Sequence, residues 1–235
     1  MENEKINYLL KEYTYLPEHK TKREYYDYMK RIDTNLVSIK AKEIVTESEK
    51  ERLLGHWVEH FELDTIKTEL KIVSNPKAHT IDPLLKYINE PTRFEFLTAI
   101  ALKKAFPRLQ VVPNYKADDE GLPTCFAPGG GADITCFDDK GNILFEVTLL
   151  TGVQQNIREM PAIARHLREC TAVAPDSFSI MICPRVHDDT QRYARFIKHD
   201  ENLDVVVLDT VAFADTLGVY TSAREYRSLP NPPQF

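Results

Sequence analysis

The chain has 235 residues, 43% of them hydrophobic and 28% charged, so it can bury a substantial core as one large domain or as one domain with an appendage. Its net charge of −6 argues against a protein that binds nucleic acid alone through a broad basic surface. No apolar run approaches a membrane span, the start is not a signal peptide, and the four cysteines lack CxxC spacing. We therefore expect a cytoplasmic protein with free thiols.

The first 90 residues are rich in Lys, Glu and Tyr, and apolar residues recur there three and four positions apart. This periodicity predicts a helical N-terminal region that serves as a docking element or a linker. Its predicted helices cover residues 22–32, 48–63, 64–73 and 82–90.

From residue 91 onward, helical and strand-like patterns alternate along the chain. The order α-β-β-β-α-β-α-β predicts an α/β (α+β) fold, a mixed β-sheet flanked by helices. We assign this domain to residues 91–228 and a flexible tail to residues 229–235. Its helices are expected over 91–106, 156–170 and 190–200, its strands over 109–115, 178–184 and 203–209, and a hairpin over 132–150 with its turn at 139–142.

The hairpin sequence GGGADITCFDDKGNILFEVTLL, residues 129–150, carries two acids in apolar surroundings. Asp133 begins the first strand after three glycines, which let the backbone bend sharply and approach a ligand closely. In the second strand, alternation places Glu146 and Thr148 on one face, and Phe145 and Val147 on the other. A buried carboxylate is costly unless it is paired, so both acids need an explanation.

A third acid, Glu95, lies in the predicted helix 91–106, where nearly every neighbour is apolar, so it should point inward or toward a cleft. If Glu95, Asp133 and Glu146 converge, their oxygens suit a hard divalent cation such as Mg²⁺. Such an ion polarises a phosphodiester and lowers the pKa of an attacking water. The structural alternative is that Asp133 caps a turn while the two glutamates pair with Arg or Lys.

The order helix-Glu, strand-Asp and hairpin-strand EVT resembles the PD-(D/E)XK nuclease core, and more narrowly the AlwI/MlyI group of type IIS restriction and nicking endonucleases. The resemblance covers about residues 91–210, with GGGAD and FEVTLLTG as its most specific parts. It implies a prokaryotic, intracellular restriction endonuclease in which Glu95, Asp133 and Glu146 bind Mg²⁺, with Mn²⁺ as a substitute. We also expect the Val147 backbone carbonyl to add a metal ligand.

The resemblance further implies roles for an acid and a histidine on the following helix, which correspond to Glu159 and His166. These residues are seven apart, and hence on one helix face, if Pro161 lies in the first turn. His166 is suited to accept a proton from the attacking water or to contact the scissile phosphate. No lysine follows Glu146, and Thr148 stands in its place. The group that activates the water therefore stays open among Gln154, Gln155, Glu159 and His166.

Full-length nicking enzymes of this family carry a large recognition domain before the cleavage module, whereas here only about 90 residues precede it. We therefore expect a cleavage subunit or cleavage domain that acts on double-stranded DNA together with a recognition subunit or a second cleavage subunit, and not at a membrane. Six arginines either form a local basic rim beside the site or are ordinary surface residues: Arg158, Arg165, Arg168, Arg185, Arg192 and Arg195.

Two other functions compete with the nuclease. The sequence HWVEH fits the H-x-x-E-H pattern of a zinc metalloprotease, with His56 and His60 as ligands and Glu59 as a base, but no third ligand is marked downstream. The other rival is a non-catalytic interaction module of the nuclease fold. Such a module would be expected to lack one of the acids, and all three are present.

Overall fold

The computed structural model describes the backbone of residues 39–229 and the side chains of residues 49–229. The helix predicted over 22–32 and the tail over 230–235 lie outside the described residues. The chain divides into two compact units, and the second begins at Leu53, within helix α3 (Ile39–His60). This second unit holds the sheet and also residues 53–90, which the sequence grouped with the N-terminal region.

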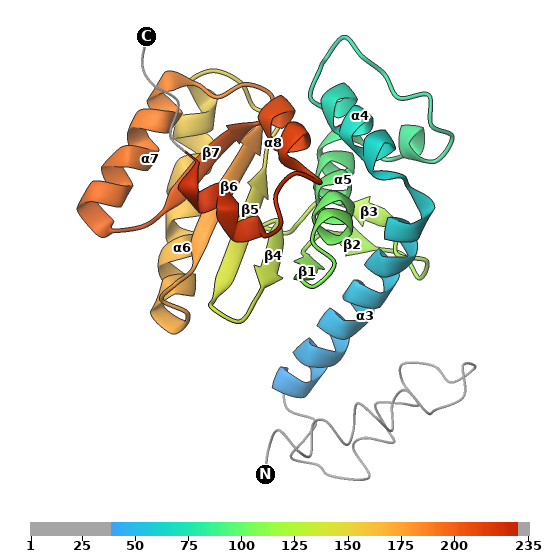
Figure 1. The fold of residues 1–235 in the computed structure, drawn as a ribbon, viewed down its shortest axis with the longest axis horizontal. Coiled ribbons are helices and arrows are strands. Elements are labelled where there is room, and N and C mark those ends of the chain that lie inside the picture. Colours follow the sequence, from blue (N-terminus) through green and yellow to red (C-terminus); the bar gives the residue numbers. More distant parts are fainter. Residues whose placement is uncertain (1–38, 230–235) are drawn as a thin grey trace. The chain divides into compact units, whose positions relative to one another are not determined.

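A five-stranded sheet with the order β1-β4-β5-β6-β7 forms the centre of this unit (Figure 1). The first three strands pair antiparallel, and β5, β6 and β7 pair parallel. The predicted mixed sheet is therefore confirmed. The strands are β1 (Gln110–Pro113), β4 (Ile134–Phe137), β5 (Asn142–Val147), β6 (Phe178–Cys183) and β7 (Val205–Asp209).

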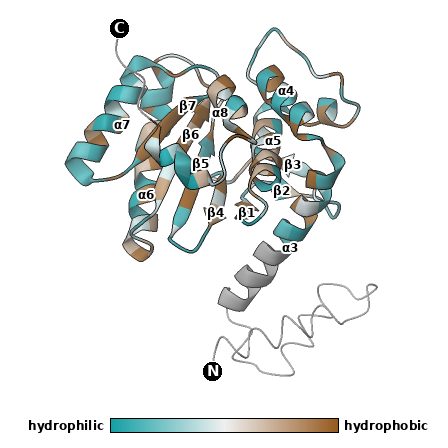
Figure 2. Ribbon diagram, in the orientation of Figure 1, coloured by the Kyte–Doolittle hydropathy of each residue, from teal (hydrophilic) through white to brown (hydrophobic). Residues whose placement is uncertain are grey.

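Helices cover both faces of the sheet, and Figure 2 shows hydrophobic residues along β6 and β7 between them. One core joins the sheet to α4 (Leu63–Val73), α5 (Glu90–Ala105) and α8 (Thr210–Thr216), and contains Phe145. The other joins it to α6 (Met160–Val173) and α7 (Asp188–Glu201), and contains Leu144. This alternation along β5 fixes which face receives Glu146.

Two predicted elements differ from the structure. The helix expected over 82–90 is only a 3₁₀ turn, Leu85–Tyr87. Asp82 Oδ1 accepts the N–H groups of Leu84 and Leu85, which holds a tight turn, and Asn89 caps α5 as a separate helix. The hairpin turn lies one residue earlier than predicted, at 138–141, because Asp138 Oδ1 accepts the N–H groups of Lys140 and Gly141.

The structure also contains elements that the sequence patterns do not predict. They are the two-stranded sheet of β2 (Lys116–Ala117) and β3 (Pro123–Cys125), helix α8, and a 3₁₀ helix over Ala223–Ser228. All four cysteines are free thiols, as expected. In the part of the chain that the structure describes, no helix is long and apolar enough to span a bilayer.

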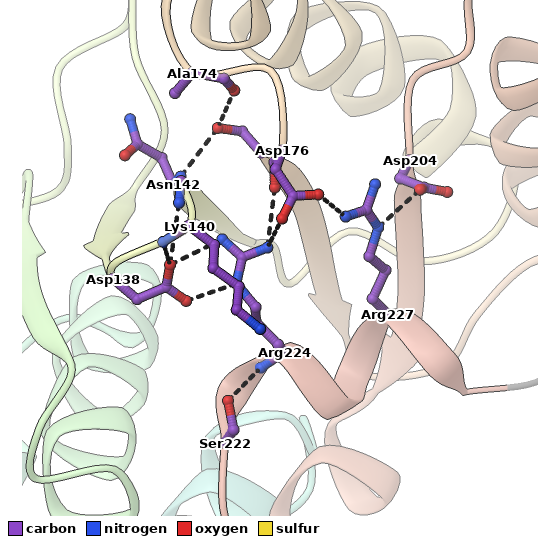
Figure 3. Close-up of polar contacts among 11 residues, drawn as sticks. Asp138, Lys140, Asn142, Ala174, Asp176, Asp204, Ser222, Arg224 and Arg227 are labelled. Carbon is purple, nitrogen blue, oxygen red and sulfur yellow. Dashed lines mark hydrogen bonds and ion pairs between the residues drawn. The ribbon is translucent and has the colours of Figure 1, made fainter.

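An ion-pair network ties the C-terminal 3₁₀ helix to the hairpin turn and to the loop before β6 (Figure 3). Arg224 binds both carboxylate oxygens of Asp138, at 2.7 and 2.9 Å, and one oxygen of Asp176 at 2.9 Å. Arg227 links Asp176 to Asp204. Burial raises the pKa of Asp138, but hydrogen bonds from Arg224 and from the turn outweigh it and lower that pKa.

Replacing Arg224 by Met should lower the free energy of unfolding by about 1–3 kcal/mol, between the values for exposed and buried ion pairs. The loss should shrink with added salt and as pH falls through the lowered pKa of Asp138, since protonation removes its charge. Urea unfolding measures this loss of stability. Arg192→Met is the control, because the ion pair of Arg192 with Asp189, at 3.8 Å, is exposed on the surface and should contribute little. Equal losses in the two variants would contradict a stabilising network.

Candidate active site

The three predicted carboxylates lie near enough at one end of the central strands for their charges to act on one another. Glu95 is buried on α5, Asp133 is half-buried directly before β4, and Glu146 is buried on β5. Ile134 pairs with Phe145 in the antiparallel register, so Asp133 lies opposite Glu146. Asp133 Oδ2 accepts the Val147 N–H at 2.8 Å, which fixes its carboxylate beside the end of β5.

The loop before β4 closes this site on the side of α5. The Ala127 N–H donates to Glu95 Oε2 at 2.9 Å, so the loop is held against the helix by the predicted acid itself. Gly130 has a φ of 110°, a conformation that favours glycine, and nothing lies within 4 Å of the Cβ that another residue would add. The backbone at Gly130 therefore uses the conformational freedom expected of the triple glycine, and the space beside it is open.

The carboxylates disfavour one another's charge. Burial raises the pKa of Glu95 to about 7, where the Ala127 N–H opposes the shift and the charge of Glu146 adds to it. Burial, then Glu146 and Glu95, raise the pKa of Asp133 well above its ordinary value. Burial also raises the pKa of Glu146, although His166 counteracts it. Such a set of oxygen donors suits a hard cation, which would remove the mutual repulsion.

Both ring nitrogens of His166, which lies on α6, make hydrogen bonds. Its Nδ1 lies 2.8 Å from Glu146 Oε1, and its Nε2 lies 3.2 Å from Arg165 Nη2. A guanidinium only donates, so Nε2 accepts and the ring proton is assigned to Nδ1, where it donates to Glu146. In this arrangement His166 orients Glu146. The predicted alternative roles, proton acceptance and phosphate contact, would require Arg165 to move away.

Thr148 and Glu159 form a second pair beside the carboxylates. Thr148 follows β5 on the same face as Glu146, as predicted, and its Oγ1 donates to Glu159 Oε1 at 3.0 Å. Glu159 ends a π-helical turn, Gln155–Glu159, after which α6 begins with Pro161 in its first turn. Glu159 and His166 thus both reach the Glu146 face of β5.

One water-activating candidate is excluded by its contacts. The amide of Gln155 is fully buried and bonded to four groups of the surrounding backbone and side chains. An amide has no basic site, and this one has no hydrogen-bonding capacity left for a water. No local pattern marks this arrangement, because its partners lie at residue 150 and in the stretch 185–190.

The six arginines fall into two groups. Arg168 is paired with Glu201, Arg192 lies near Asp189, and Arg195 bonds the Gln191 carbonyl. The other three are exposed next to site residues in the sequence or in space: Arg158, which precedes Glu159; Arg165, which contacts His166; and Arg185, whose carbonyl is bound by Gln155. The predicted basic rim is thus reduced to three side chains.

No group of three or more His, Cys, Asp or Glu side chains is arranged as a ready metal cage anywhere in the described residues. The H-x-x-E-H pattern therefore has no third ligand among the described residues, and zinc needs one. His56, Glu59 and His60 lie exposed on α3, and both histidine rings pack edge-on against Trp57. Mg²⁺ is less demanding, because one or two carboxylates together with water and phosphate oxygens complete its shell.

Comparisons with known proteins give a family model and a similar solved structure. The profile of the AlwI restriction endonuclease family matches residues 41–211, a range that includes all the site residues named above. Among solved structures, the small subunit (R.BspD6I2) of the heterodimeric restriction endonuclease R.BspD6I is 26% identical, with a TM-score of 0.52 over 64% of this chain and 76% of that chain. The search of curated proteins gives no match.

Proposed function

Because the chain belongs to the AlwI restriction endonuclease family, we propose that it is a Mg²⁺-dependent endonuclease subunit, of type IIS or nicking kind, that hydrolyses phosphodiester bonds in double-stranded DNA. The observation that carries the proposal is the convergence of Glu95, Asp133 and Glu146 within the family match, each with a raised pKa. A non-catalytic module would have no need for three mutually repelling acids.

The acids named above, with the Val147 carbonyl, are the groups that would hold Mg²⁺, and Mn²⁺ is expected to substitute. When bound, the ion polarises the phosphodiester and supplies a water of lowered pKa. His166 orients Glu146 through its 2.8 Å hydrogen bond and opposes the rise in the pKa of that carboxyl that burial causes. Glu159 is the best placed proton acceptor, because Thr148 fixes one of its oxygens and no arginine contact occupies the other in the described residues.

We further propose that the chain acts with a second subunit. The solved neighbour is one subunit of a heterodimeric enzyme. A net charge of −6 and a rim of three arginines give this chain little surface for gripping DNA on its own. A partner that recognises the target sequence would supply that grip and deliver the scissile strand to the carboxylates.

A plasmid nicking assay tests both parts. The full chain is incubated with supercoiled DNA and Mg²⁺, with and without a candidate recognition subunit encoded beside it. Site-specific nicked or linear DNA should form only with the partner, and EDTA should prevent it. Site-specific cleavage by the chain alone would refute the partner, and absence of cleavage with the partner in both Mg²⁺ and Mn²⁺ would refute the nuclease.

The rim predicts a difference between exposed arginines. Arg185→Ala should weaken DNA binding by the assembled enzyme and reduce the slope of log affinity against log salt by about 0.9, the value for one phosphate contact. Arg168→Ala should change neither, because Glu201 already engages that guanidinium. Fluorescence anisotropy between about 50 and 200 mM salt measures both. An unchanged slope in Arg185→Ala would remove it from the DNA surface.

A further inference from the structure

Gln155 is fully buried and makes four side-chain hydrogen bonds, more than any polar group of the candidate site. Its Nε2 donates to the carbonyls of Leu150 and Arg185, each at 2.8 Å. Its Oε1 accepts the His187 N–H at 3.0 Å and the Thr190 hydroxyl at 3.3 Å. These bonds use both donors and both lone pairs of the amide.

The four partners belong to segments that leave the same edge of the sheet. Leu150 lies in the loop after β5, Arg185 and His187 lie in the loop after β6, and Thr190 lies in the first turn of α7. Since β5 and β6 are parallel neighbours, their carboxyl ends meet at the edge that carries Glu146. One amide therefore fastens together the loops that border the candidate site.

A continuous series of hydrogen bonds leads from this amide to Glu159. Gln155 holds the Leu150 carbonyl, and the Leu150 N–H donates to Thr148 Oγ1 at 3.1 Å. The same hydroxyl donates to Glu159 Oε1 at 3.0 Å. Gln155 also opens the π-helical turn that Glu159 ends, so the two residues are linked through that turn as well.

We propose that Gln155 is a positioning residue, which sets the place of Glu159 relative to Glu146 through Leu150 and Thr148. The assignment of a reaction to Glu159 rests on the proposed nuclease function, whereas the positioning of segment 148–159 does not. Removal of the amide would leave the partly buried carbonyls of Leu150 and Arg185 and the N–H of His187 without this partner, and the loops would separate to reach water.

Gln191 provides a matched control on the neighbouring helix α7. It is also a buried glutamine, with 9% of its surface exposed, but its Nε2 has no hydrogen-bond partner. Replacing each glutamine by Met preserves length and removes the amide. Gln191→Met should therefore be neutral or slightly stabilising, and only Gln155→Met should affect the site.

Hydrogen exchange on the full chain tests the positioning directly. In Gln155→Met the protection of the Leu150 amide should fall by about tenfold or more, the equivalent of one lost buried hydrogen bond, while amides of β6 keep theirs. Gln155→Glu, which keeps side-chain length and oxygen acceptors but loses both donors, should have the same effect and serves if the Met variant does not fold. Unchanged protection of Leu150 would overturn the proposal.

Kinetics of the assembled enzyme test the link to Glu159. Gln155→Glu should lower kcat by about 10- to 100-fold, as expected for a misplaced catalytic group, and leave KM for DNA within about threefold. The same substitution should have almost no effect in a Glu159→Gln background, because the group that it positions is already absent. An undiminished effect in that background would overturn the link. A wild-type enzyme without cleavage would refute the proposed function instead, and the exchange result would still decide the positioning.

Discussion

Replacing Asp133 by Asn or Glu146 by Gln should abolish DNA cleavage, with a loss of at least about 10³-fold, corresponding to several kcal/mol of lost metal assistance. A neutral amide binds Mg²⁺ poorly and removes one of the charges that attract it. The fold should persist, because an amide oxygen at 133 still accepts the Val147 N–H, and one at 146 still accepts the His166 ring proton. Cleavage of supercoiled DNA by the assembled enzyme in Mg²⁺ measures the loss.

Glu69 offers a matched control for this experiment. It is a buried acid on α4 whose pKa is raised chiefly by burial, but its charged neighbours are Asp82 and Arg93, not the carboxylates of the site. Glu69→Gln should therefore leave cleavage within about threefold of the unaltered chain, since it touches no metal-binding group. Mg²⁺-dependent cleavage retained by both site variants, or lost equally in Glu69→Gln, would refute the assignment of the site.

The parts of the site that could be predicted lie where the sequence has a clear hydrophobic period. The apolar strands and the period-two alternation around Glu146 predict the mixed sheet and the shared face of Glu146 and Thr148, which the contacts with His166 and Glu159 confirm. The seven-residue spacing of Glu159 and His166 gives their common helix face. In each case the signal lies in residues adjacent in the sequence or one helical repeat apart.

The parts that escaped prediction depend on contacts between distant segments. The helix expected over 82–90 gives way to a turn because Asp82 and Asn89 bind neighbouring backbone N–H groups, which compete with the helix. The contact of Arg165 with His166 places a guanidinium beside an imidazole, a pairing that spacing alone does not suggest. The four bonds of Gln155 join residues 150, 185, 187 and 190, so no local pattern marks it.

The raised pKa values of the site carboxyls predict an unusual pH dependence of stability. In the folded chain burial, assisted by the charge of Glu146, raises the pKa of Glu95 from 4.5 to about 7. The folded state therefore binds more protons than the unfolded state between these values, and stability falls as pH rises. The contribution of Glu95 to the free energy of unfolding should be fully present below about pH 4.5. It should decline by up to about 3 kcal/mol by pH 8. Asp133 and Glu146 act in the same direction.

Mg²⁺ should reverse this decline, because it binds the ionised carboxylates of the folded chain. At a concentration one hundred times its dissociation constant, a ligand specific for the folded state contributes about 2.7 kcal/mol. We therefore expect Mg²⁺ to raise Tm clearly at pH 8 and little at pH 5, where Glu95 is protonated. Calorimetry of the full chain in EDTA and in Mg²⁺, at both pH values, measures the difference.

Glu95→Gln isolates the contribution of the site from that of other acids. The ion-paired Asp138 and Asp176 have lowered pKa values, so their stability is lost only as pH falls below the ordinary range of carboxyls. They leave the interval from pH 5 to 8 undisturbed. Across that interval Glu95→Gln should flatten the decline seen in EDTA and weaken the effect of Mg²⁺. A metal-free chain that loses as much stability with Gln at 95 as with Glu would show that the pKa of Glu95 is not raised in the folded chain.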